Sequence, residues 1–397
     1  MTESKTKTPN RRSLLKGAAA GAVAAGTVAL VGCGKKEEPV ATQAAPAAPA
    51  APSVATTGTT TLRFQSTWPA KDIFHEYAND FAKKVNDMAG GKLKIEVLPA
   101  GAVVPAFQLL DAVSKGTLDG GHGVVAYWYG KNSALALWGS GPGYGMDANM
   151  VLAWHNYGGG KALVDEIYKS LNLDVQSYLY GPMPTQPLGW FKKPISKVED
   201  MKGLKFRTVG LAVDVFTEMG TAVNPLPGGE IVPALDRGLI DAAEFNNASS
   251  DRVLGFPDVA KNCMLQSFHQ SGEQFEILFN KTKLAALPAE QKAIIDYAVQ
   301  AASADMSWKA ISRNSEDYEA LKKQGIKFYK TPDAILRAQL AAWDKTIAKK
   351  SAENPMFKKV LDSQKAFAQR AGQWQNDYTV DFKMAFNHYF GRNAKKA

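Results

Sequence analysis

One ten-residue pattern occurs in two distant parts of the chain, and it constrains the fold more than any other feature. Residues 112–121 read AVSKGTLDGG and residues 234–243 read ALDRGLIDAA, so both place a basic residue, Gly, two further residues, Asp and two small residues in the same order. Gly commonly follows the last residue of a helix, so each stretch predicts a helix, a glycine stop and a short strand. Generic reuse of helix, Gly and strand would not preserve this order. The repeat predicts two α/β lobes of similar build.

The first lobe opens with a strand, a helix and a strand. Residues 61–68 and 92–99 alternate apolar and polar side chains, as strands do. The segment between them carries apolar side chains at helical spacing, at Phe74, Tyr77, Phe81 and Val85.

A ligand cleft is expected where the strands of the two lobes end, because ligands of open α/β sheets gather beyond the carboxyl ends of strands. Tyr127 and Glu244 each lie just past such an end. Glu244 also stands directly ahead of two amides, Asn246 and Asn247, after a short apolar strand. A solvated glutamate needs no such setting, whereas a glutamate that binds a cation does.

A long helix is predicted from Pro288, which suits a first turn, to Gly325, with no breaker between them. At 1.5 Å per residue, about 36 residues span roughly 55 Å, which is longer than one lobe, so this helix is expected to cross both lobes. The first lobe is predicted to comprise residues 61–183 with about 274–300, and the second lobe residues 184–273 with about 301–345. Residues 346–397 are predicted to form C-terminal helices.

The last predicted helix carries a stripe of aromatic side chains at helical spacing: Trp374, Tyr378, Phe382, Phe386 and Tyr389. We expect this stripe to pack on its own domain, and a dimer contact is the alternative.

The N-terminus predicts export. Arg11 and Arg12 precede a weakly apolar run at 17–32, which is too short for a membrane span and resembles a twin-arginine signal. The run ends in LVGC, which resembles a lipobox in which Cys33 becomes lipidated. Residues 1–33 are therefore predicted to be a lipoprotein signal, and the protein to be periplasmic and anchored to a membrane by lipid.

Residues 34–60 are rich in Ala and Pro and lack large apolar side chains, which predicts a flexible tether. If Cys33 is acylated, the other cysteine, Cys263, has no partner for a disulfide.

The chain has a net charge of +9, a modest excess that suits solubility and the binding of anions. Five Lys and Arg residues against one Glu put +4 of it in residues 1–33, which leaves +5 for the rest of the chain. No Lys/Arg cluster with interleaved aromatic residues is present, so no nucleic-acid partner is predicted.

Motifs of common enzymes are absent from the sequence. It contains no GxSxG elbow, no phosphate-binding loop and no paired cysteines for a metal, and His75-Glu76 lacks the second histidine of a zinc protease. A binding protein is therefore favoured over an enzyme. The alternatives are an exported lyase that uses Glu244 as a base and a sensory binding protein that signals to a receptor.

Two long segments resemble a known family. Residues 185–210, TQPLGWFKKPISKVEDMKGLKFRTVG, and residues 224–247, NPLPGGEIVPALDRGLIDAAEFNN, resemble DctP-type solute-binding subunits of tripartite ATP-independent periplasmic (TRAP) transporters. The resemblance runs from about Leu62 to the C-terminus and is strongest to the branch that binds 2-oxo and 2-hydroxy monocarboxylates with a metal ion. It implies a two-lobed periplasmic-binding-protein fold, a pyruvate- or lactate-like ligand, and membrane permease subunits as partners.

The resemblance also implies a binding site for the organic anion. Arg207 holds the place of an arginine that makes a two-pronged contact with the ligand carboxylate, which suits a planar guanidinium. Tyr127 holds the place of a tyrosine whose hydroxyl meets the same carboxylate. Gln270 holds a position in the pocket wall.

For the metal ion, the resemblance implies the side chains of Gln186 and Glu244 and the backbone carbonyl of Phe245. Asn246 is expected to orient Glu244 or to bond the ligand. The alternative is that Asn246 and Asn247 cap the helix that follows.

A count of charges favours Na⁺ and keeps Ca²⁺ as the alternative. The monocarboxylate and Arg207 neutralise each other, so Glu244 leaves one buried negative charge, which is costly. Hard cations prefer the oxygen ligands that these residues offer. Na⁺ restores neutrality, whereas Ca²⁺ requires another anion that the sequence does not identify.

Overall fold

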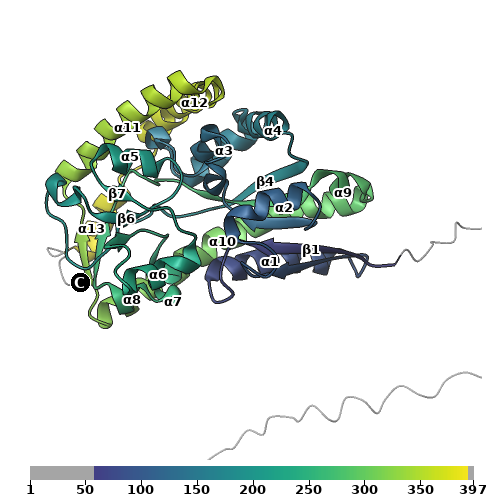
Figure 1. Cartoon of the computed structure of the whole chain (residues 1–397), viewed down its shortest axis with the longest axis horizontal. Helices are drawn as coiled ribbons and strands as arrows, with labels where there is room; N and C mark the ends of the chain where they lie inside the picture. The colour runs from purple at the N-terminus through teal and green to yellow at the C-terminus, as the bar shows by residue number, and fades with distance from the viewer. Residues whose placement is uncertain (1–57, 392–397) are drawn as a thin grey trace, which may run out of the picture. The chain divides into compact units, whose positions relative to one another are not determined.

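The computed structural model describes residues 58–391, and Figure 1 shows their elements. The predicted signal at 1–33, Cys33 with it, lies outside the described residues, and so does most of the predicted tether at 34–60. The last three tether residues are described, and Thr60 already begins strand β1.

The first sheet has five strands in the order β2-β1-β3-β10-β4. Strand β1 runs parallel to β2 and β3, whereas β10 runs antiparallel to β3 and β4. The bounds are β1 Thr60–Ser66, β2 Leu93–Leu98, β3 Gly120–Gly123, β4 Val175–Pro182 and β10 Gln274–Asn280. Because β10 follows every strand of the second sheet except β11, the chain leaves the first lobe and returns to it.

The second sheet has six strands in the order β11-β9-β5-β8-β6-β7. Strand β6 is parallel to β7 and β8, β5 is antiparallel to β8 and β9, and β11 is parallel to β9. The bounds are β5 Gly189–Phe191, β6 Lys205–Arg207, β7 Ala222–Val223, β8 Ala242–Ala243, β9 Asn262–Leu265 and β11 Lys327–Lys330.

Helices surround both sheets (Figure 1). Their bounds are α1 Ile73–Met88, α2 Leu109–Ser114, α3 Ala148–Tyr157, α4 Gly160–Ser170, α5 Ala212–Glu218, α6 Gly228–Asp236, α7 Ala248–Leu254, α8 Phe256–Val259, α9 Lys281–Ala286, α10 Ala289–Lys323, α11 Asp333–Glu353, α12 Pro355–Tyr378 and α13 Phe382–Phe390. Short 3-10 turns include η2 Val125–Trp128 and η3 Ser133–Trp138.

The two sheets repeat one topology, which confirms the prediction of two lobes of similar build. The order β2-β1-β3-β10-β4 matches β7-β6-β8-β5-β9, with β11 as an added edge strand. The repeated pattern occupies equivalent places, since Gly116 ends α2 before β3 and Gly238 ends α6 before β8. Both glycines adopt a left-handed φ, +75° and +70°, which explains why Gly stands at this position in each copy.

The aspartate of the repeated pattern also has one role in both lobes. The backbone N–H of Asp119 donates to the carbonyl of Arg63 at 2.9 Å, and the carboxylate of Asp119 accepts from the N–H of Arg63 at 2.6 Å. Asp241 makes the same pair of bonds with Lys205, at 2.7 and 3.1 Å. Each aspartate therefore ties the turn after a helix to an equivalent strand, β1 in the first lobe and β6 in the second.

Helix α10 crosses both lobes, as the sequence predicts. It packs on α1 and β4 of the first lobe and on α7 of the second. Arg313 of α10 pairs with Glu76 of α1 at 2.8 Å, and Asp317 of α10 pairs with Arg252 of α7. The strands of each sheet fall in the ranges predicted for their lobe, apart from Thr60 at the start of β1; the domain boundaries themselves remain a prediction.

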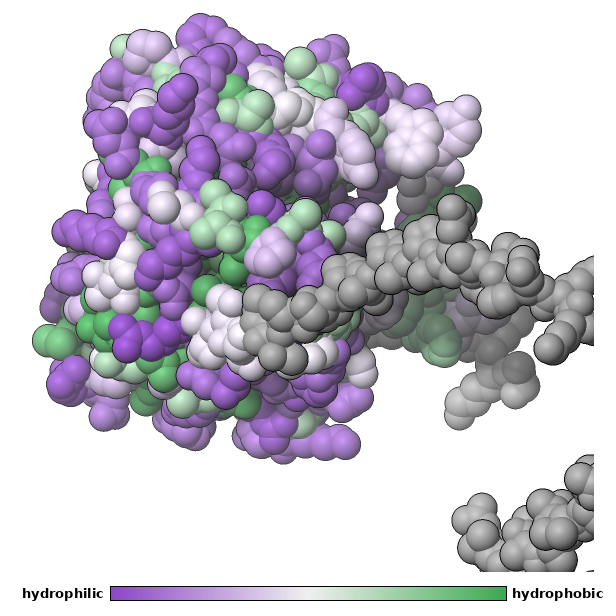
Figure 2. Space-filling view, turned by 90° about the vertical axis from the view of Figure 1, so that its right-hand side faces the viewer, coloured by the Kyte–Doolittle hydropathy of each residue, from purple (hydrophilic) through white to green (hydrophobic). Residues whose placement is uncertain are grey.

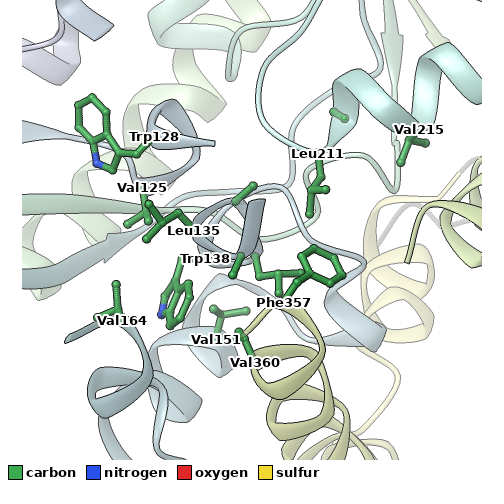
Figure 3. Packing of buried hydrophobic residues seen from close by; sticks show 14 of the residues in the cluster. Val125, Trp128, Leu135, Trp138, Val151, Val164, Leu211, Val215, Phe357 and Val360 are labelled. Atoms are coloured by element: carbon green, nitrogen blue, oxygen red, sulfur yellow. The ribbon is translucent and has the colours of Figure 1, made fainter. Parts of the chain in front are cut away.

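One apolar core joins the first half of α12 to parts of both lobes. Figure 3 shows Phe357 and Val360 of α12 close to Trp138 and Val151, with Leu211 at the start of α5 nearby. All five side chains are buried. The lobes are therefore in contact through this core as well as through α10.

The C-terminal aromatic stripe does not pack on its own domain, so that expectation is wrong. The single predicted helix is two helices, α12 and α13, separated at residues 379–381, and Asp381 caps α13 by accepting from the N–H groups of Lys383 and Met384. The exposed fractions are Trp374 62%, Tyr378 79%, Phe382 70%, Phe386 61% and Tyr389 68%. Nothing in residues 58–391 covers this stripe.

The rest of the surface is more ordinary. Figure 2 shows one face of the chain that is mainly hydrophilic, with small apolar areas scattered over it. Within residues 58–391, no helix has both the length and the apolar character that a membrane crossing requires.

Candidate functional site

The site lies where two connecting segments pass between the lobes. One segment joins β4 to β5 and the other joins β9 to β10, and they lie side by side. The N–H of Met183 donates to the carbonyl of Glu273 at 2.9 Å, and the N–H of Gln186 donates to the carbonyl of Gln270 at 3.3 Å. Gln186, Gln270 and Glu273 therefore lie on two paired segments that connect the two sheets.

Arg207 ends strand β6 and is 1% exposed. Its Nε donates to the carbonyl of Leu226 at 2.8 Å, and its Nη1 donates to the carbonyl and to Oε1 of Glu244, at 3.0 and 2.8 Å. The Nη2 group has no hydrogen-bond partner. The guanidinium is therefore held in place by the second lobe, with one donor group left to bind an anion.

Glu244 follows strand β8 and is fully buried. Its Oε1 accepts from Arg207, whereas its Oε2 has no hydrogen-bond partner and lies 3.9 Å from Nε2 of His269. His269 is also buried, and its Nδ1 lies 2.7 Å from the hydroxyl of Ser267. The free oxygen of Glu244 is thus available to a cation.

Glu273, which the sequence analysis did not single out, is a second buried carboxyl group of the site. Its Oε2 accepts from Nε2 of Gln186 at 3.0 Å, and the remaining oxygen of each side chain has no partner. Burial and the nearby Glu244 raise the pKa of Glu273 to about 8, while Arg207 acts in the opposite direction. A cation beside this carboxyl group would favour its ionised form.

Six buried polar atoms without partners gather here. They are Gln186 Oε1, Arg207 Nη2, Glu244 Oε2, His269 Nε2, Gln270 Oε1 and Glu273 Oε1. Buried polar atoms nearly always have a partner, and each one left without costs about 1–3 kcal/mol. Four oxygens and two nitrogens in one site therefore fit a cation and an anion bound together.

The kinds of donor atom indicate which metal ions fit. Among residues 58–391, no three His, Cys, Asp or Glu side chains are placed together to hold a metal ion. Carboxylate oxygens here are instead combined with the amide oxygens of Gln186 and Gln270. Such a set fits a hard cation, Na⁺ or Ca²⁺, better than the nitrogen and sulfur sets of zinc sites.

Aromatic side chains form the wall of a small cavity beside these groups. The cavity has a volume of about 10 Å³, which is about that of one water molecule, and Arg207, Gln270 and Glu273 contribute to its lining. The aromatic side chains in its lining are those of Trp68, Phe74, Tyr127 and Phe245. The space between these side chains therefore admits about one water molecule, and a larger ligand requires the walls to move apart.

Two of these aromatic residues were predicted site residues. The ring of Phe245 lies 5.7 Å from Cζ of Arg207 and so helps to hold the guanidinium. The ring of Tyr127 lies 5.7 Å from that of Trp68. Burial raises the pKa of the Tyr127 hydroxyl, so this group keeps its proton and can donate it in a hydrogen bond.

The two amides after Phe245 have different surroundings. Asn247 caps α7, since its side chain accepts from the N–H of Ala248, so the predicted cap belongs to Asn247. Asn246 is buried, and its Nδ2 donates to the sulfur of Met183 at 3.2 Å. The structure thus brings Tyr127, Gln186, Arg207, Glu244 and Gln270 together and places Asn246 at their edge.

A much larger hollow lies elsewhere, between α3, α4, β4 and α10, with a volume of about 1,090 Å³. Its lining includes the exposed rings of Tyr157, Tyr297 and Trp308. None of the described residues that line it has a buried polar atom without a partner. The chemistry therefore favours the small cavity as the binding site.

Sequence reasoning missed Glu273 and His269. Both lie in the stretch HQSGEQF, from which only Gln270 was chosen. A signal was present, because Glu273 directly precedes β10, whose residues are all buried. A charged residue at the start of a fully buried strand is seldom left without a partner.

Comparison with known proteins agrees with this site. The family model of bacterial extracellular solute-binding proteins, family 7 (DctP), matches residues 64–354. A monocarboxylate 2-oxoacid-binding periplasmic protein of Nostoc sp. strain PCC 7120 is 34% identical over 364 residues, which are 92% of this chain and 95% of that protein.

Solved structures show the same architecture. A TRAP transporter solute-binding protein of Bordetella bronchiseptica RB50, a mixed-occupancy dimer with copurified calcium and picolinate, has a TM-score of 0.78 and 29% identity, covering 84% of this chain and 97% of that chain. A TRAP periplasmic solute-binding protein of Pseudoalteromonas atlantica T6c, with bound sodium and pyruvate, has a TM-score of 0.77 and 29% identity, covering 84% and 99%.

These matches confirm the family that the sequence segments resemble, and with it the two-lobed α/β fold. Members of the family are substrate-binding proteins of transporters, so the prediction of a binding protein and not an enzyme is also confirmed. The family works outside the cytoplasm. This chain belongs to the DctP family, the solute-binding proteins of TRAP transporters.

Proposed function

We propose that this chain captures one small 2-oxo or 2-hydroxy monocarboxylate, of the pyruvate or lactate type, together with a metal ion, and delivers it to membrane permease subunits. One observation carries the proposal: the free Nη2 of Arg207 and four oxygens without partners share one buried site. An anion alone would pair with the guanidinium but would be repelled by the four oxygens without partners. A cation alone would pair with the oxygens but would be repelled by the guanidinium. The site therefore needs an anion and a cation together.

Arg207 is proposed to bind the ligand carboxylate. Its Nε and Nη1 are already engaged by Leu226 and Glu244, which fixes the guanidinium plane before the ligand arrives. Charge-assisted bonds of this kind are roughly twice as strong as neutral ones. The hydroxyl of Tyr127 provides a second donor for the same carboxylate.

The side-chain oxygens of Gln186 and Glu244 and the carbonyl of Phe245 are proposed to hold the cation. When bound, the cation would offer a second point of attachment to a ligand that carries an oxygen beside its carboxylate. This preference selects acids with an oxygen at the 2-position, which agrees with the relative named for 2-oxoacids and with the pyruvate bound in a related structure. Gln270 and Asn246 are proposed to complete the wall around the ligand.

The lobes are proposed to close on the ligand about the two connecting segments and α10. The first lobe would comprise 61–183 with about 274–300, and the second 184–273 with about 301–345. Direct contacts already join the lobes near the site, since Ser250 of α7 donates to the carboxylate of Asp72 at 2.9 Å.

Isothermal titration calorimetry of chelator-treated, desalted protein tests the function. We expect pyruvate or lactate to bind only after Na⁺ or Ca²⁺ is restored, because the oxygens of Gln186 and Glu244 otherwise face the ligand without a counter-charge. Propionate is the matched control ligand, since it has the carboxylate but lacks the 2-oxygen, and it should bind far more weakly. Equal affinity for pyruvate with and without metal ions would contradict the bridging role.

We also propose that the aromatic stripe on α12 and α13 binds a second copy of the chain. The related protein from B. bronchiseptica is a dimer, and five large rings at 61–79% exposure are unusual for a surface in water. The double change Phe382→Ser and Phe386→Ser should convert a dimer to a monomer in light scattering and leave pyruvate binding intact. Lys383→Ser, on the same helix, is the control, and a wild-type monomer at micromolar concentration would contradict the proposal.

Export by the twin-arginine route and lipidation of Cys33 remain proposals from the sequence, as that region lies outside the described residues. The extracytoplasmic family supports export, and a lipid anchor would hold the binding protein near its permease. Mass spectrometry of the exported protein tests lipidation, since a diacylglyceryl group would be found on Cys33.

A further inference from the structure

We propose that Glu273 is the second carboxylate of the cation site and makes the site selective for a divalent ion, Ca²⁺, over Na⁺. This inference rests on the proposed function, because it concerns the same anion and the same cation. It assigns the additional anion that the charge count from the sequence required for Ca²⁺ and did not find.

The geometry places Glu273 among the other oxygen donors. Gln186 and Glu273 hold each other through one hydrogen bond of 3.0 Å, and each keeps one oxygen without a partner. Glu244 likewise keeps one free oxygen after its bond to Arg207. Three side chains, each fixed by one bond, therefore present one oxygen each within the same buried site.

The charges then balance for a divalent ion. With Glu273 ionised by the neighbouring cation, the bound anion, Glu244 and Glu273 carry three negative charges, and Arg207 carries one positive charge. One Ca²⁺ neutralises the remaining two, whereas Na⁺ would leave one negative charge buried, which is costly. Calcium also accepts six to eight oxygen ligands, and carboxylates are among its preferred ones.

Another buried acid near the site does not compete for this role. Asp251 uses both of its oxygens, since Oδ2 accepts from Nε1 of Trp190 at 2.7 Å and Oδ1 accepts from the N–H of Asn246 at 3.1 Å. Glu273 differs because its Oε1 has no partner. Among these two acids, only Glu273 has an oxygen to offer.

The Glu273 carboxylate lies close to Gly139. A Cβ at Gly139 would lie 2.8 Å from Oε1 of Glu273, so the carboxylate fits against a position that has no side chain. The change Gly139→Ala would displace the carboxylate and keep its charge. This variant therefore tests whether the position of the Glu273 carboxylate matters as well as its charge.

The test uses calorimetry of pyruvate binding at saturating Ca²⁺ and at saturating Na⁺, with the full-length protein. For the wild type we expect Ca²⁺ to support binding at least about tenfold better than Na⁺. Glu273→Gln keeps the size and the bond to Gln186, and should reduce the Ca²⁺ advantage by about 10- to 1,000-fold, the range over which one neighbouring charge shifts an ionic equilibrium. Elemental analysis after dialysis should show that the variant retains less calcium.

Two further variants show whether a loss of Ca²⁺ preference comes from the missing charge of Glu273 or from misfolding. Glu290→Gln removes an exposed carboxylate on α10, 61% exposed and paired with Lys92, and should leave both affinities unchanged. If Glu273→Gln does not fold, Gly139→Ala should show the same loss of Ca²⁺ preference.

The outcomes distinguish this inference from the function on which it rests. A Glu273→Gln variant with the Ca²⁺ preference and calcium content of the wild type overturns the inference. A wild type that binds pyruvate better with Na⁺ than with Ca²⁺ overturns it as well and leaves the proposed function standing. A wild type that binds no 2-oxo or 2-hydroxy acid with either ion overturns the proposed function and the inference together.

Discussion

Replacing Arg207 by Ala should weaken pyruvate binding by a factor of about 30 to several thousand. Truncation of one partner of a buried, hydrogen-bonded charge pair costs about 2–5 kcal/mol, which corresponds to this range. The loss is large because the side chain is 1% exposed, so water cannot take its place at the ligand carboxylate. Calorimetry at saturating metal ion measures the effect directly.

Lys205→Ala provides the matched control. Lys205 lies two residues earlier in strand β6 and is exposed, so the change removes the same charge from the same strand and should leave the affinity nearly unchanged. Arg207→Lys should bind better than Arg207→Ala but worse than the wild type, because a single ammonium group cannot replace the guanidinium, which bonds to Leu226 and Glu244 and still keeps Nη2 for the ligand. Pyruvate affinity of Arg207→Ala within threefold of the wild type would refute the role of Arg207.

The same substitution should also lower stability. Glu244 is fully buried, and in Arg207→Ala its carboxylate would lose its ion-pair partner, which costs about 3–5 kcal/mol in comparable cases. Circular dichroism must therefore show that the variant is folded at the temperature of the binding measurement. A folded variant that has lost binding separates the role in recognition from the role in stability.

The repeated sequence pattern predicted the two-lobed fold because it contains the residues that build each lobe. Gly116 and Gly238 supply the left-handed turns, and Asp119 and Asp241 tie those turns to the equivalent strands β1 and β6. These are local interactions, so the sequence carries them in contiguous form. The way in which β10 returns to the first sheet is not local, and no short motif encodes it.

The site was predictable only in part for the same reason. Arg207 and Glu244 lie in contiguous segments that resemble family motifs, and their strands β6 and β8 are neighbours in the sheet. Glu273 comes from another connecting segment and meets Gln186 only because the two segments cross between the lobes. Its part in the charge balance therefore became visible only in the folded chain.

The C-terminal stripe shows a limit of pattern reading. Apolar side chains at helical spacing predict that one face of a helix is covered, and they do not say by what. Burial against the same chain and burial against a second copy give the same pattern. The structure shows that the described residues of the same chain do not bury the stripe, since Trp374 and Phe382 remain 62% and 70% exposed.

Gly189→Ala should destabilise the protein by about 2–6 kcal/mol and weaken ligand binding, although residue 189 has no side chain in the site. Gly189 adopts a φ of +143°, which residues with a side chain rarely adopt. A Cβ there would lie 2.6 Å from the carbonyl oxygen of Ala243 and 3.2 Å from the backbone nitrogen of Glu244. Strain and overpacking of this kind each cost about 1–3 kcal/mol.

The clash should act on the site because relief requires β5 to move away from β8, and β8 leads directly into Glu244. A shift of Glu244 would disturb both the bond to Arg207 and the oxygen offered to the cation. Thermal unfolding and calorimetry measure the two effects. Gly130→Ala is the control, since no atom lies within 4 Å of its added Cβ, and it should change stability by no more than about 0.5 kcal/mol. Unaltered melting and binding in Gly189→Ala would mean that the β5–β8 pairing does not position Glu244.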